Sequence, residues 1–347
     1  MKRFTISASS TYDVITGYDT IKDIGKYTGE VLDPCRLCII TDSTVNNLYS
    51  QVVLTSLIES GFQTSKIVFP SGEHSKNLST YTNILEALAD EGITRSDAVV
   101  ALGGGAVGDI AGFAAATYMR GIRYIQIPTT YEAAVDAAYG GETGLNLMSG
   151  KNLVGAFWQP SLVLCDYKFF ETLSDLKIKD GAAEAVKFAV ISESSLADHI
   201  LKNDYEYVVE RCISIKKSLI EADEKCYGLR QILGFGHTVG QAVEKLSSYS
   251  LPHGHAVAIG MVVESRAAFK AGLTKTDISV ELTDIFKRLG FDTSCHYSAD
   301  EIYNLAVMDK KIFGDKISVI VPEKFGKCSL HKISISNLRE YIREGLK

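Results

Sequence analysis

Three side chains in the second half of the chain, Glu184, His237 and His253, could together bind a divalent metal ion. The chain has only seven histidines, and these two lie in segments of helical character, GHTVGQAVEKL and LPHGHAVAIGM. Imidazole nitrogen and carboxylate oxygen suit Zn²⁺ or a similar ion, and three protein ligands leave a position open for substrate. The spacing is looser than in H-E-x-x-H. The alternative that both histidines end helices and are satisfied by hydrogen bonds therefore stays open.

A glycine-rich turn in the first half of the chain could bind phosphate. The apolar run 98–102 ends in three glycines, 103–105, and Gly108, Asp109 and an Ala- and Gly-rich segment follow. This order predicts a strand, a tight turn and a helix, with another strand at 124–127. Glycines at such a junction let backbone N–H groups approach a phosphate, and the helix N-terminus favours negative charge. The spacing is not G-x-G-x-x-G, so a purely structural turn remains the alternative to nucleotide binding.

Alternating strands and helices must position this turn. Strands are predicted at residues 36–41, 65–69 and 98–102, and helices at 46–60 and 77–90. Such alternation predicts a mostly parallel sheet with helices on both faces, in which ligands bind beyond the carboxyl ends of the strands. Asp42 and the segment SGEHSK (71–76) each follow one of these strands. We therefore expect them at the same edge of the sheet as the glycine turn.

The second half of the chain is predicted to be mainly helical. Helical patterns cover residues 181–191, 205–225, 236–246, 255–271 and 276–289, and short strands are expected at 317–321 and 328–333. We therefore expect an α/β domain with a Rossmann-like sheet over residues 1–175 and a helical domain over residues 176–347. A site would lie in the crevice between them.

Composition and charge narrow the class of protein. A chain of 347 residues, 46% hydrophobic and 22% charged, is long enough for two globular domains. A formal charge of −6 and a pI near 5.7 argue against a nucleic-acid partner. No apolar run reaches the roughly 18 residues of a membrane span, so no membrane partner is expected. Seven cysteines and no signal-peptide pattern at the start favour a reducing, cytoplasmic location.

Taken in order, segments spread over nearly the whole chain resemble the 3-dehydroquinate synthase family. They are GGGAVGDIAGFAAATYMRG, IPTT, GLNLMSGKNLVGAFWQP, GAAEAVKFAVI, ADEKCYGLR, GHTVGQAVE, HGHAVAIGMV and MDKK. The wider group of sugar-phosphate cyclases shares the pattern, and metal-dependent glycerol dehydrogenases share the fold more distantly. The resemblance implies a homodimer whose chains carry an N-terminal NAD-binding domain and a C-terminal helical domain for metal and substrate.

The resemblance also implies a reaction. The family are phosphorus–oxygen lyases of the shikimate pathway to aromatic amino acids. They convert 3-deoxy-D-arabino-heptulosonate 7-phosphate (DAHP) to 3-dehydroquinate and phosphate. The steps are transient oxidation by NAD⁺, β-elimination of phosphate, reduction and intramolecular aldol closure. A divalent metal, Zn²⁺ or Co²⁺, acts as a Lewis acid on the substrate oxygen.

Residue by residue, the resemblance implies three groups of contacts. By this resemblance, the metal is bound by Glu184, His237 and His253. The residues that the resemblance assigns to NAD⁺ binding are Asp42, Ser71, Gly72, Glu73, His74, Ser75, Lys76, Gly105, Ala106, Val107, Gly108, Asp109, Thr129, Thr130, Lys151, Phe169, Phe170, Glu171 and Thr172. The residues that the resemblance assigns to substrate binding are Asp136, Asn152, Lys187, Lys216 and Arg230, with Lys310 or Lys311. Arg120 matches an arginine that reaches the phosphate bound to the neighbouring subunit.

Four positions depart from the family pattern. Glu142 stands in GGETG where GGKTG is usual, and Gly234 and Gln241 replace Asn and His in LNxGHTxGHAxE. His255 replaces the glutamate that usually follows His-Gly. A charge about 4 Å from a phosphate is worth roughly 4 kcal/mol at an effective dielectric near 20, so reversing its sign is costly. Gln241 cannot act as a general base.

Three functions therefore stay open from the sequence. The first is a working 3-dehydroquinate synthase with altered site details. The second is a sibling sugar-phosphate cyclase or an NAD-linked polyol dehydrogenase, and the third is a degenerate, non-catalytic paralogue. Arg230 favours a substrate with a carboxylate, which suits its planar guanidinium. Phosphate release without NADH accumulation would indicate a cyclase, whereas net NADH release would indicate a dehydrogenase.

Overall fold

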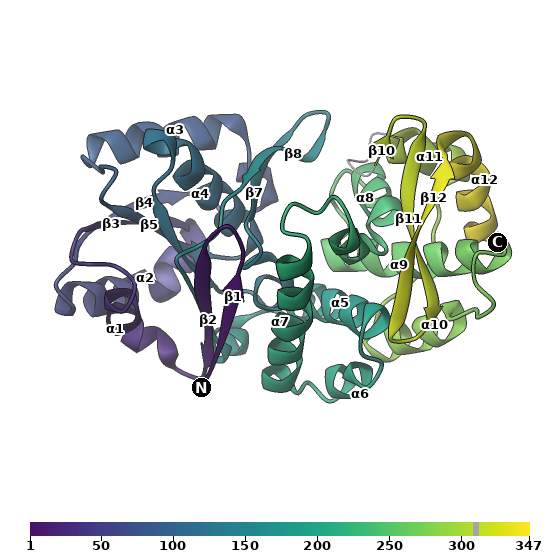
Figure 1. Cartoon of the computed structure of the whole chain (residues 1–347), viewed down its shortest axis with the longest axis horizontal. Helices are drawn as coiled ribbons and strands as arrows, with labels where there is room; N and C mark the ends of the chain where they lie inside the picture. Colours follow the sequence, from purple (N-terminus) through teal and green to yellow (C-terminus); the bar gives the residue numbers. More distant parts are fainter. Residues whose placement is uncertain (308–311) are drawn as a thin grey trace. The chain divides into compact units, whose positions relative to one another are not determined.

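A computed structural model describes residues 1–307 and 312–347 of the chain, which form two compact units, Met1–Leu173 and Ser174–Lys347 (Figure 1). The boundary expected after residue 175 lies close to this division. Strands dominate the first unit and helices the second, as the hydrophobic patterns predict.

The first unit is built on a seven-stranded sheet in the order β1-β2-β9-β6-β5-β3-β4. Its strands are β1 (Lys2–Ser7), β2 (Thr11–Gly17), β3 (Arg36–Asp42), β4 (Gln63–Phe69), β5 (Ala98–Gly103), β6 (Arg123–Pro128) and β9 (Leu162–Asp166). The five strands from β9 to β4 are parallel, and β2 pairs in parallel with β9. Only β1 is antiparallel, paired with β2. The mostly parallel sheet is confirmed, but the sequence prediction contained neither β1 nor β2.

Helices cover both faces of this sheet. They are α1 (Ile24–Gly29), α2 (Ser43–Glu59), α3 (Leu78–Asp90) and α4 (Gly105–Thr117). One face of the central strands, including Cys38, Ile40, Val99 and Ala101, packs against buried residues of α3 and α4. Alternate residues point to the other face, where α2 contacts β3, β4 and β5. Because both faces are covered, β5 is buried along its whole length.

Shorter elements complete the first unit. A separate antiparallel hairpin joins β7 (Glu142–Leu147) to β8 (Gly150–Phe157). Short 3₁₀ helices lie at η1 (Thr20–Asp23), η2 (Glu73–Ser75), η3 (Tyr118–Arg120) and η5 (Tyr167–Thr172), and η4 (Ala133–Ala137) is a π-helical turn. These turns carry many of the expected site residues.

The second unit consists of helices around α9 and a small antiparallel sheet. The helices are α5 (Asp175–Ile191), α6 (Leu196–Leu201), α7 (Tyr205–Ala222), α8 (His237–Leu246), α9 (His253–Lys270), α10 (Ser279–Arg288), α11 (Ala299–Ala306) and α12 (Ile335–Leu346), with the turn η6 (Leu229–Gly234). The sheet has the order β10 (Ile312–Phe313), β11 (Lys316–Lys324) and β12 (Lys327–Ser334). Helix α9 contacts α5, α8, α10 and α12.

Glycines let α8 and α9 touch backbone to backbone. A Cβ atom on Gly260 would lie 1.9 Å from the carbonyl oxygen of Gly236, and one on Gly240 would lie 2.9 Å from that of Ala256. Real Cβ atoms do not approach other atoms at the first of these distances, so glycine is required at residue 260. This contact fixes the start of α8 against α9, which bears on the two histidines that begin these helices.

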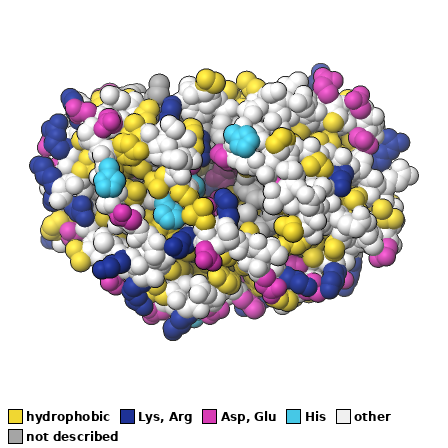
Figure 2. Space-filling view, turned by 180° about the vertical axis from the view of Figure 1, so that it is seen from behind, with side chains coloured by type: hydrophobic (Ala, Val, Ile, Leu, Met, Phe, Trp, Pro, Cys, Tyr) yellow, Lys and Arg dark blue, Asp and Glu magenta, His cyan; other side chains and the backbone are white. Residues whose placement is uncertain are grey.

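The structure also describes the hydropathy of the helices and the distribution of charge on one face. Among the described residues, every helix is too short or too polar to cross a membrane. Acidic and basic side chains are interspersed on the face drawn in Figure 2.

Candidate active site

Glu184, His237 and His253 come together in the second unit. Glu184 lies in α5, whereas His237 and His253 are the first residues of α8 and α9. One potential ligand atom of each residue lies within 4.8 Å of the others. The Nε2 atoms of His237 and His253 lie 3.5 and 3.3 Å from Oε1 of Glu184. The prediction that a helix begins at residue 255 was wrong, because α9 already includes His253.

Both imidazole rings are oriented by hydrogen bonds on their other nitrogen. Nδ1 of His237 donates to the carbonyl oxygen of Phe235 at 3.1 Å, and Nδ1 of His253 donates to Oε2 of Glu244 at 3.2 Å. These bonds direct both Nε2 atoms toward Glu184. Metal-binding histidines characteristically make such a second hydrogen bond.

The electrostatics of the cluster are those of a buried anion held among cations. Burial opposes ionisation of Glu184, but Lys187, His237 and His253 lower its pKa well below the usual value. Burial lowers the pKa of His237 to about 4, so this ring is neutral at pH 7. Burial also acts to lower the pKa of His253, but Glu184 and Glu244 raise it to about 10. Metal binding would displace the proton that His253 then carries.

These residues fit a divalent metal ion. Oε1 of Glu184 is buried and faces the Nε2 atoms of both histidines. Ligand atoms about 2.0–2.1 Å from a tetrahedral Zn²⁺ lie about 3.3 Å apart, which agrees with the Nε2–Oε1 separations of 3.5 and 3.3 Å. Two imidazoles and one carboxylate suit Zn²⁺ or Co²⁺ and leave a coordination position open.

Three expected substrate residues are buried cations in the same unit. Lys187, Lys216 and Arg230 are 1%, 3% and 0% exposed, and they belong to α5, α7 and η6, which contact one another. The backbone N–H of Arg230 donates to Asp223, and its guanidinium donates to the carbonyl oxygen of Glu224 at 2.5 Å. Three positively charged side chains on adjoining elements suit an anionic substrate.

In the first unit, the glycine turn forms the junction predicted from the sequence. Gly104 is the N-cap of α4, and no side chain caps this helix. A Cβ atom on Gly105 would lie 3.0 Å from the Glu132 carboxylate, and one on Gly108 would lie 2.7 Å from the Gln126 side chain. The uncapped amides of the first turn, which includes Ala106 and Val107, are the groups that bind phosphate at helix N-termini, and Asp109 follows one turn into the helix.

Next to this turn, Lys76 joins three segments of the first unit. Its buried ammonium pairs with Asp109 of α4 and lies 2.5 Å from Oδ1 of Asn152 in β8. Lys151 lies 3.7 Å from Glu73, which also accepts a hydrogen bond from Asn146. The structure thus brings together the expected residues Glu73, Lys76, Asp109, Lys151 and Asn152.

Other expected cofactor residues lie at the carboxyl ends of the strands or follow them. Asp42 caps α2 by accepting hydrogen bonds from the N–H groups of Thr44 and Val45. Thr129 follows β6, and its buried hydroxyl has no hydrogen-bond partner in the described part of the chain. Thr130 accepts a hydrogen bond from the N–H of Ala133. A buried hydroxyl without a partner is consistent with a ligand-facing position.

The remaining expected residues differ in exposure. Phe169 and Phe170 are buried and pack on Tyr49 and Tyr131, whereas Glu171 and Thr172 are exposed and bond to Tyr18 and Tyr49. In the segment 71–76, Ser71 donates its N–H to Ser43, Ser75 is buried, and Gly72 and His74 are exposed. Asp136 lies half-buried in the π-helical turn η4. Lys310 and Lys311 lie outside the described residues.

Two expected substrate residues have an unusual backbone conformation. Arg120 has φ 67° and Asn152 has φ 54°, in the left-handed region, and Met119 before Arg120 has φ 50°. Such a conformation costs about 1–3 kcal/mol for a residue with a side chain and is often found at functional sites. Arg120 is exposed at the end of the turn that follows α4.

The four departures from the family pattern are divided between the units. Glu142 begins β7. Burial raises the pKa of Asp109 against the effect of Lys76, and the charges of Glu73 and Glu142 add to this rise. Gly234 ends η6, just before the turn that leads into His237. Gln241 lies one turn into α8, and His255 packs on Phe291 near the start of α9.

Sequence analysis missed three acidic residues that surround the metal cluster. Glu244 orients His253, as described above. Asp180 of α5 accepts a hydrogen bond from the N–H of Gly254, next to His253, at 3.0 Å. Glu264 of α9 accepts hydrogen bonds from Gly236 and Val239, on either side of His237. A single acid within an apolar helix, such as Glu264 in AIGMVVESRAAF, was the available signal.

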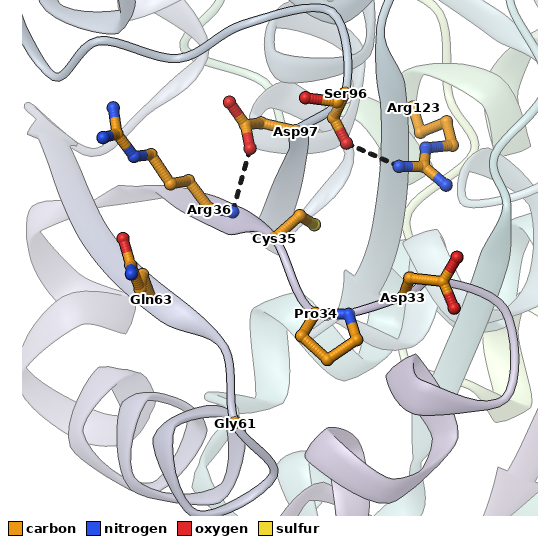
Figure 3. A pocket seen from close by; sticks show the side chains of 9 residues that line it. All are labelled: Asp33, Pro34, Cys35, Arg36, Gly61, Gln63, Ser96, Asp97 and Arg123. Carbon is orange, nitrogen blue, oxygen red and sulfur yellow. Dashed lines mark hydrogen bonds between the residues drawn. The ribbon is translucent and has the colours of Figure 1, made fainter.

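A cavity of about 410 Å³ lies at the opposite edge of the first unit's sheet (Figure 3). Its lining includes Arg36, Gln63 and Arg123, the first residues of β3, β4 and β6. Asp97 accepts a hydrogen bond from the N–H of Arg36, and Arg123 donates to the carbonyl oxygen of Ser96. None of the expected site residues lines this cavity. It lies at the amino ends of the strands, whereas ligands of parallel sheets bind at the carboxyl ends.

Comparison with known proteins identifies close relatives of the chain. Residues 66–180 match the family "3-dehydroquinate synthase N-terminal", and residues 181–312 match "3-dehydroquinate synthase C-terminal". The chain is 37% identical to a 3-dehydroquinate synthase of Streptococcus suis (strain 05ZYH33), over 98% of this chain and 99% of that protein. It is 38% identical to one of Clostridium acetobutylicum, over 96% and 97% of the two chains. A crystal structure of 2-deoxy-scyllo-inosose synthase with carbaglucose-6-phosphate, NAD⁺ and Co²⁺ is 26% identical, with a TM-score of 0.86 over 99% of this chain and 100% of that one.

Proposed function

This chain belongs to the 3-dehydroquinate synthase family, and we propose that it converts DAHP to 3-dehydroquinate and inorganic phosphate. The observation that carries the proposal is the match to these synthases over nearly the whole length, together with the convergence of Glu184, His237 and His253. A cyclase of this kind is a lyase, since phosphate leaves by elimination.

The cofactors of the proposed enzyme are NAD⁺ and a divalent metal. A solved relative with both NAD⁺ and Co²⁺ supports them, as do the uncapped turn before α4 and the donor set around Glu184. We assign NAD⁺ to the first unit and the metal to the second, and we assign the substrate to residues that include Lys187, Lys216 and Arg230 of the second unit. When bound, NAD⁺ would accept a hydride from a carbinol carbon of the substrate and later return it, and the metal would polarise the oxygen bonded to that carbon.

The chain's own residues bind and orient the substrate in this proposal. Lys187 and Lys216 hold anionic oxygens in a buried environment, where each charge acts more strongly than in water. Arg230 binds the carboxylate through its planar guanidinium, because two parallel N–H groups match two carboxylate oxygens. Asp136, Asn152 and Lys310 are assigned to substrate by resemblance.

We further propose a cytoplasmic homodimer. All seven cysteines lie in the described part of the chain, and they form no disulfide there, which supports a reducing compartment. In the proposed dimer, Arg120 reaches the substrate phosphate of the neighbouring subunit. Its strained backbone supports a functional position for this side chain.

The experiment that tests the proposed reaction is a stoichiometric product assay. Purified chain with NAD⁺, Zn²⁺ and DAHP is expected to release phosphate and form 3-dehydroquinate in equal amounts, while the absorbance of NADH stays flat. Steady accumulation of NADH would instead identify a dehydrogenase. Phosphate release from a sugar phosphate without a carboxylate, but not from DAHP, would identify a sibling cyclase.

A further inference from the structure

Glu264 is a buried acidic residue on α9 that binds the backbone around the metal ligand His237. Its side chain lies in the interior of the second unit, and the residue is 4% exposed. Oε2 accepts a hydrogen bond from the N–H of Gly236 at 2.9 Å, and Oε1 accepts one from the N–H of Val239 at 3.0 Å. His237 lies between these two anchored amides in the chain.

The two amides occupy defined positions at the start of α8. Gly236 is the N-cap residue, with φ 79°, and Val239 is the third residue of the helix. In a capping box, two local side chains satisfy the N–H groups of these two positions. Gly236 has no side chain, so the N-cap residue itself cannot supply a side-chain acceptor to the first turn of α8. Glu264 supplies both acceptors from another helix, and its negative charge is favourable at a helix N-terminus.

Helix α9 thereby determines the position of both histidine ligands. His253 is its first residue, and Glu264 follows eleven residues later, about 16 Å along the helix axis. Gly260 lies between them and packs against the carbonyl oxygen of Gly236. Helix α9 therefore contacts both the carbonyl oxygen and the N–H group of Gly236, through Gly260 and Glu264 respectively. In return, Glu244 of α8 orients the His253 ring. Each helix thus begins with one of the two histidine ligands and carries a carboxylate that positions the ligand of the other helix.

We propose that Glu264 is a positioning residue of the metal centre. It holds the turn 236–239 so that Nε2 of His237 faces Glu184. The inference rests on the proposed metal site, and it assigns a role to a residue outside the ligand set. Groups that orient metal ligands typically change metal affinity by about 10–100-fold when they are removed.

The test measures Co²⁺ binding to the full chain in the absence of substrate. Glu264→Gln keeps the size of the side chain but leaves one acceptor oxygen, and its NH₂ group faces the second amide N–H. We expect Co²⁺ affinity, measured by competition with a chelator, to fall by about 10–100-fold. The visible absorption spectrum of bound Co²⁺ should also change, because the imidazole geometry around the ion changes. Glu264→Asp keeps the carboxylate and should recover part of both signals.

Asp97→Asn is a matched control for the loss of a buried carboxylate. Asp97 is 5% exposed and accepts hydrogen bonds from the N–H groups of Arg36 and Thr94, but it lies in the first unit. This variant should be destabilised without a change in Co²⁺ affinity or spectrum. A folded Glu264→Gln variant with the wild-type affinity and spectrum would overturn the inference. So would an effect confined to stability, with the folded fraction binding Co²⁺ normally.

Failure of the proposed metal site gives a different result from failure of this inference. A folded wild-type chain that binds no Co²⁺ or Zn²⁺ would refute the site and the role of Glu264 together. A wild-type chain that binds Co²⁺ no more tightly than Glu264→Gln and Glu264→Ala would refute the role of Glu264 alone.

Discussion

The ammonium of Lys187 lies 2.6 Å from Oε2 of Glu184, one helical turn away on α5, and both side chains are almost completely buried. Lys187 therefore compensates part of the Glu184 charge when no metal ion is bound. A divalent ion on Oε1 would supply positive charge from the other side of the same carboxylate. The two cations are thus coupled through one anion.

Lys187→Met should destabilise the metal-free protein more than the Zn²⁺-loaded protein. Removing one partner of a buried ion pair typically costs about 3–5 kcal/mol, because the other charge stays buried. Bound Zn²⁺ would replace the missing charge, so the loss should be clearly smaller in the loaded form. Urea unfolding of both forms measures the difference, and Lys217→Met, which breaks an exposed pair with Glu221, is the control. Equal losses in both forms would contradict the coupling.

Glu142→Lys should raise activity on DAHP. Glu142 adds to the negative charge around Asp109, where Glu73 and Glu132 also act on the Asp109–Lys76 pair. A unit charge about 4 Å from a phosphate charge is worth roughly 4 kcal/mol at an effective dielectric near 20. Removing the repulsion between Glu142 and the substrate phosphate should therefore raise the rate at least tenfold. The rate of phosphate release measures this effect.

Glu142→Gln separates the loss of negative charge from the gain of positive charge. Its rate should lie between those of the wild type and Glu142→Lys. If both substitutions lower the rate, the glutamate contributes to turnover and the assignment of DAHP as substrate must be revised.

Arg120→Ala and His237→Ala should complement each other in mixed dimers. Each variant alone lacks one group of every site, so both should be nearly inactive. If Arg120 acts on the neighbouring subunit, subunit exchange should restore activity to about a quarter of the wild-type value. Met119→Ala, next to Arg120 and equally left-handed in backbone, should stay active and shows that the backbone change alone is harmless. No recovery after verified exchange would contradict action across the dimer.

Asp97 should contribute stability at neutral pH that disappears in acid. Burial alone would raise its pKa, but hydrogen bonds from Thr94 and Arg36 lower it below the usual value. Because the folded-state pKa is the lower one, the contribution is complete above the unfolded value of about 3.9 and is lost as the pH falls through the folded value. Asp97→Asn should therefore cost about 1–3 kcal/mol at pH 7 and progressively less in acid. A difference from the wild type that is constant from pH 7 to acid would contradict this.

Local patterns were sufficient to predict the glycine turn. The predicted strand at 98–102 and helix at 77–90 agree with β5 (Ala98–Gly103) and α3 (Leu78–Asp90) to within a residue. An apolar β-branched run and three consecutive glycines are signals that need no distant partner. The hairpin β1–β2 had no such signal, because its strands are stabilised by pairing with each other and with β9, far along the chain.

The metal ligands could be named from the sequence, but the groups that position them could not. Glu184, His237 and His253 were identified by residue type and by resemblance. Glu264 bonds backbone amides 28 and 25 residues away, and no side-chain pattern marks a backbone partner. The start of α9 was placed two residues late, although Pro252 immediately before His253 marks a common position for a helix to begin.

Metal removal tests the central claim most directly. The chain should be stripped with a chelator, checked for folding by circular dichroism, and assayed for phosphate release from DAHP with NAD⁺ present. The stripped protein should be inactive, and Zn²⁺ or Co²⁺ should restore the wild type but not His237→Ala. Turnover that continues unchanged after complete metal removal would contradict the role assigned to Glu184, His237 and His253.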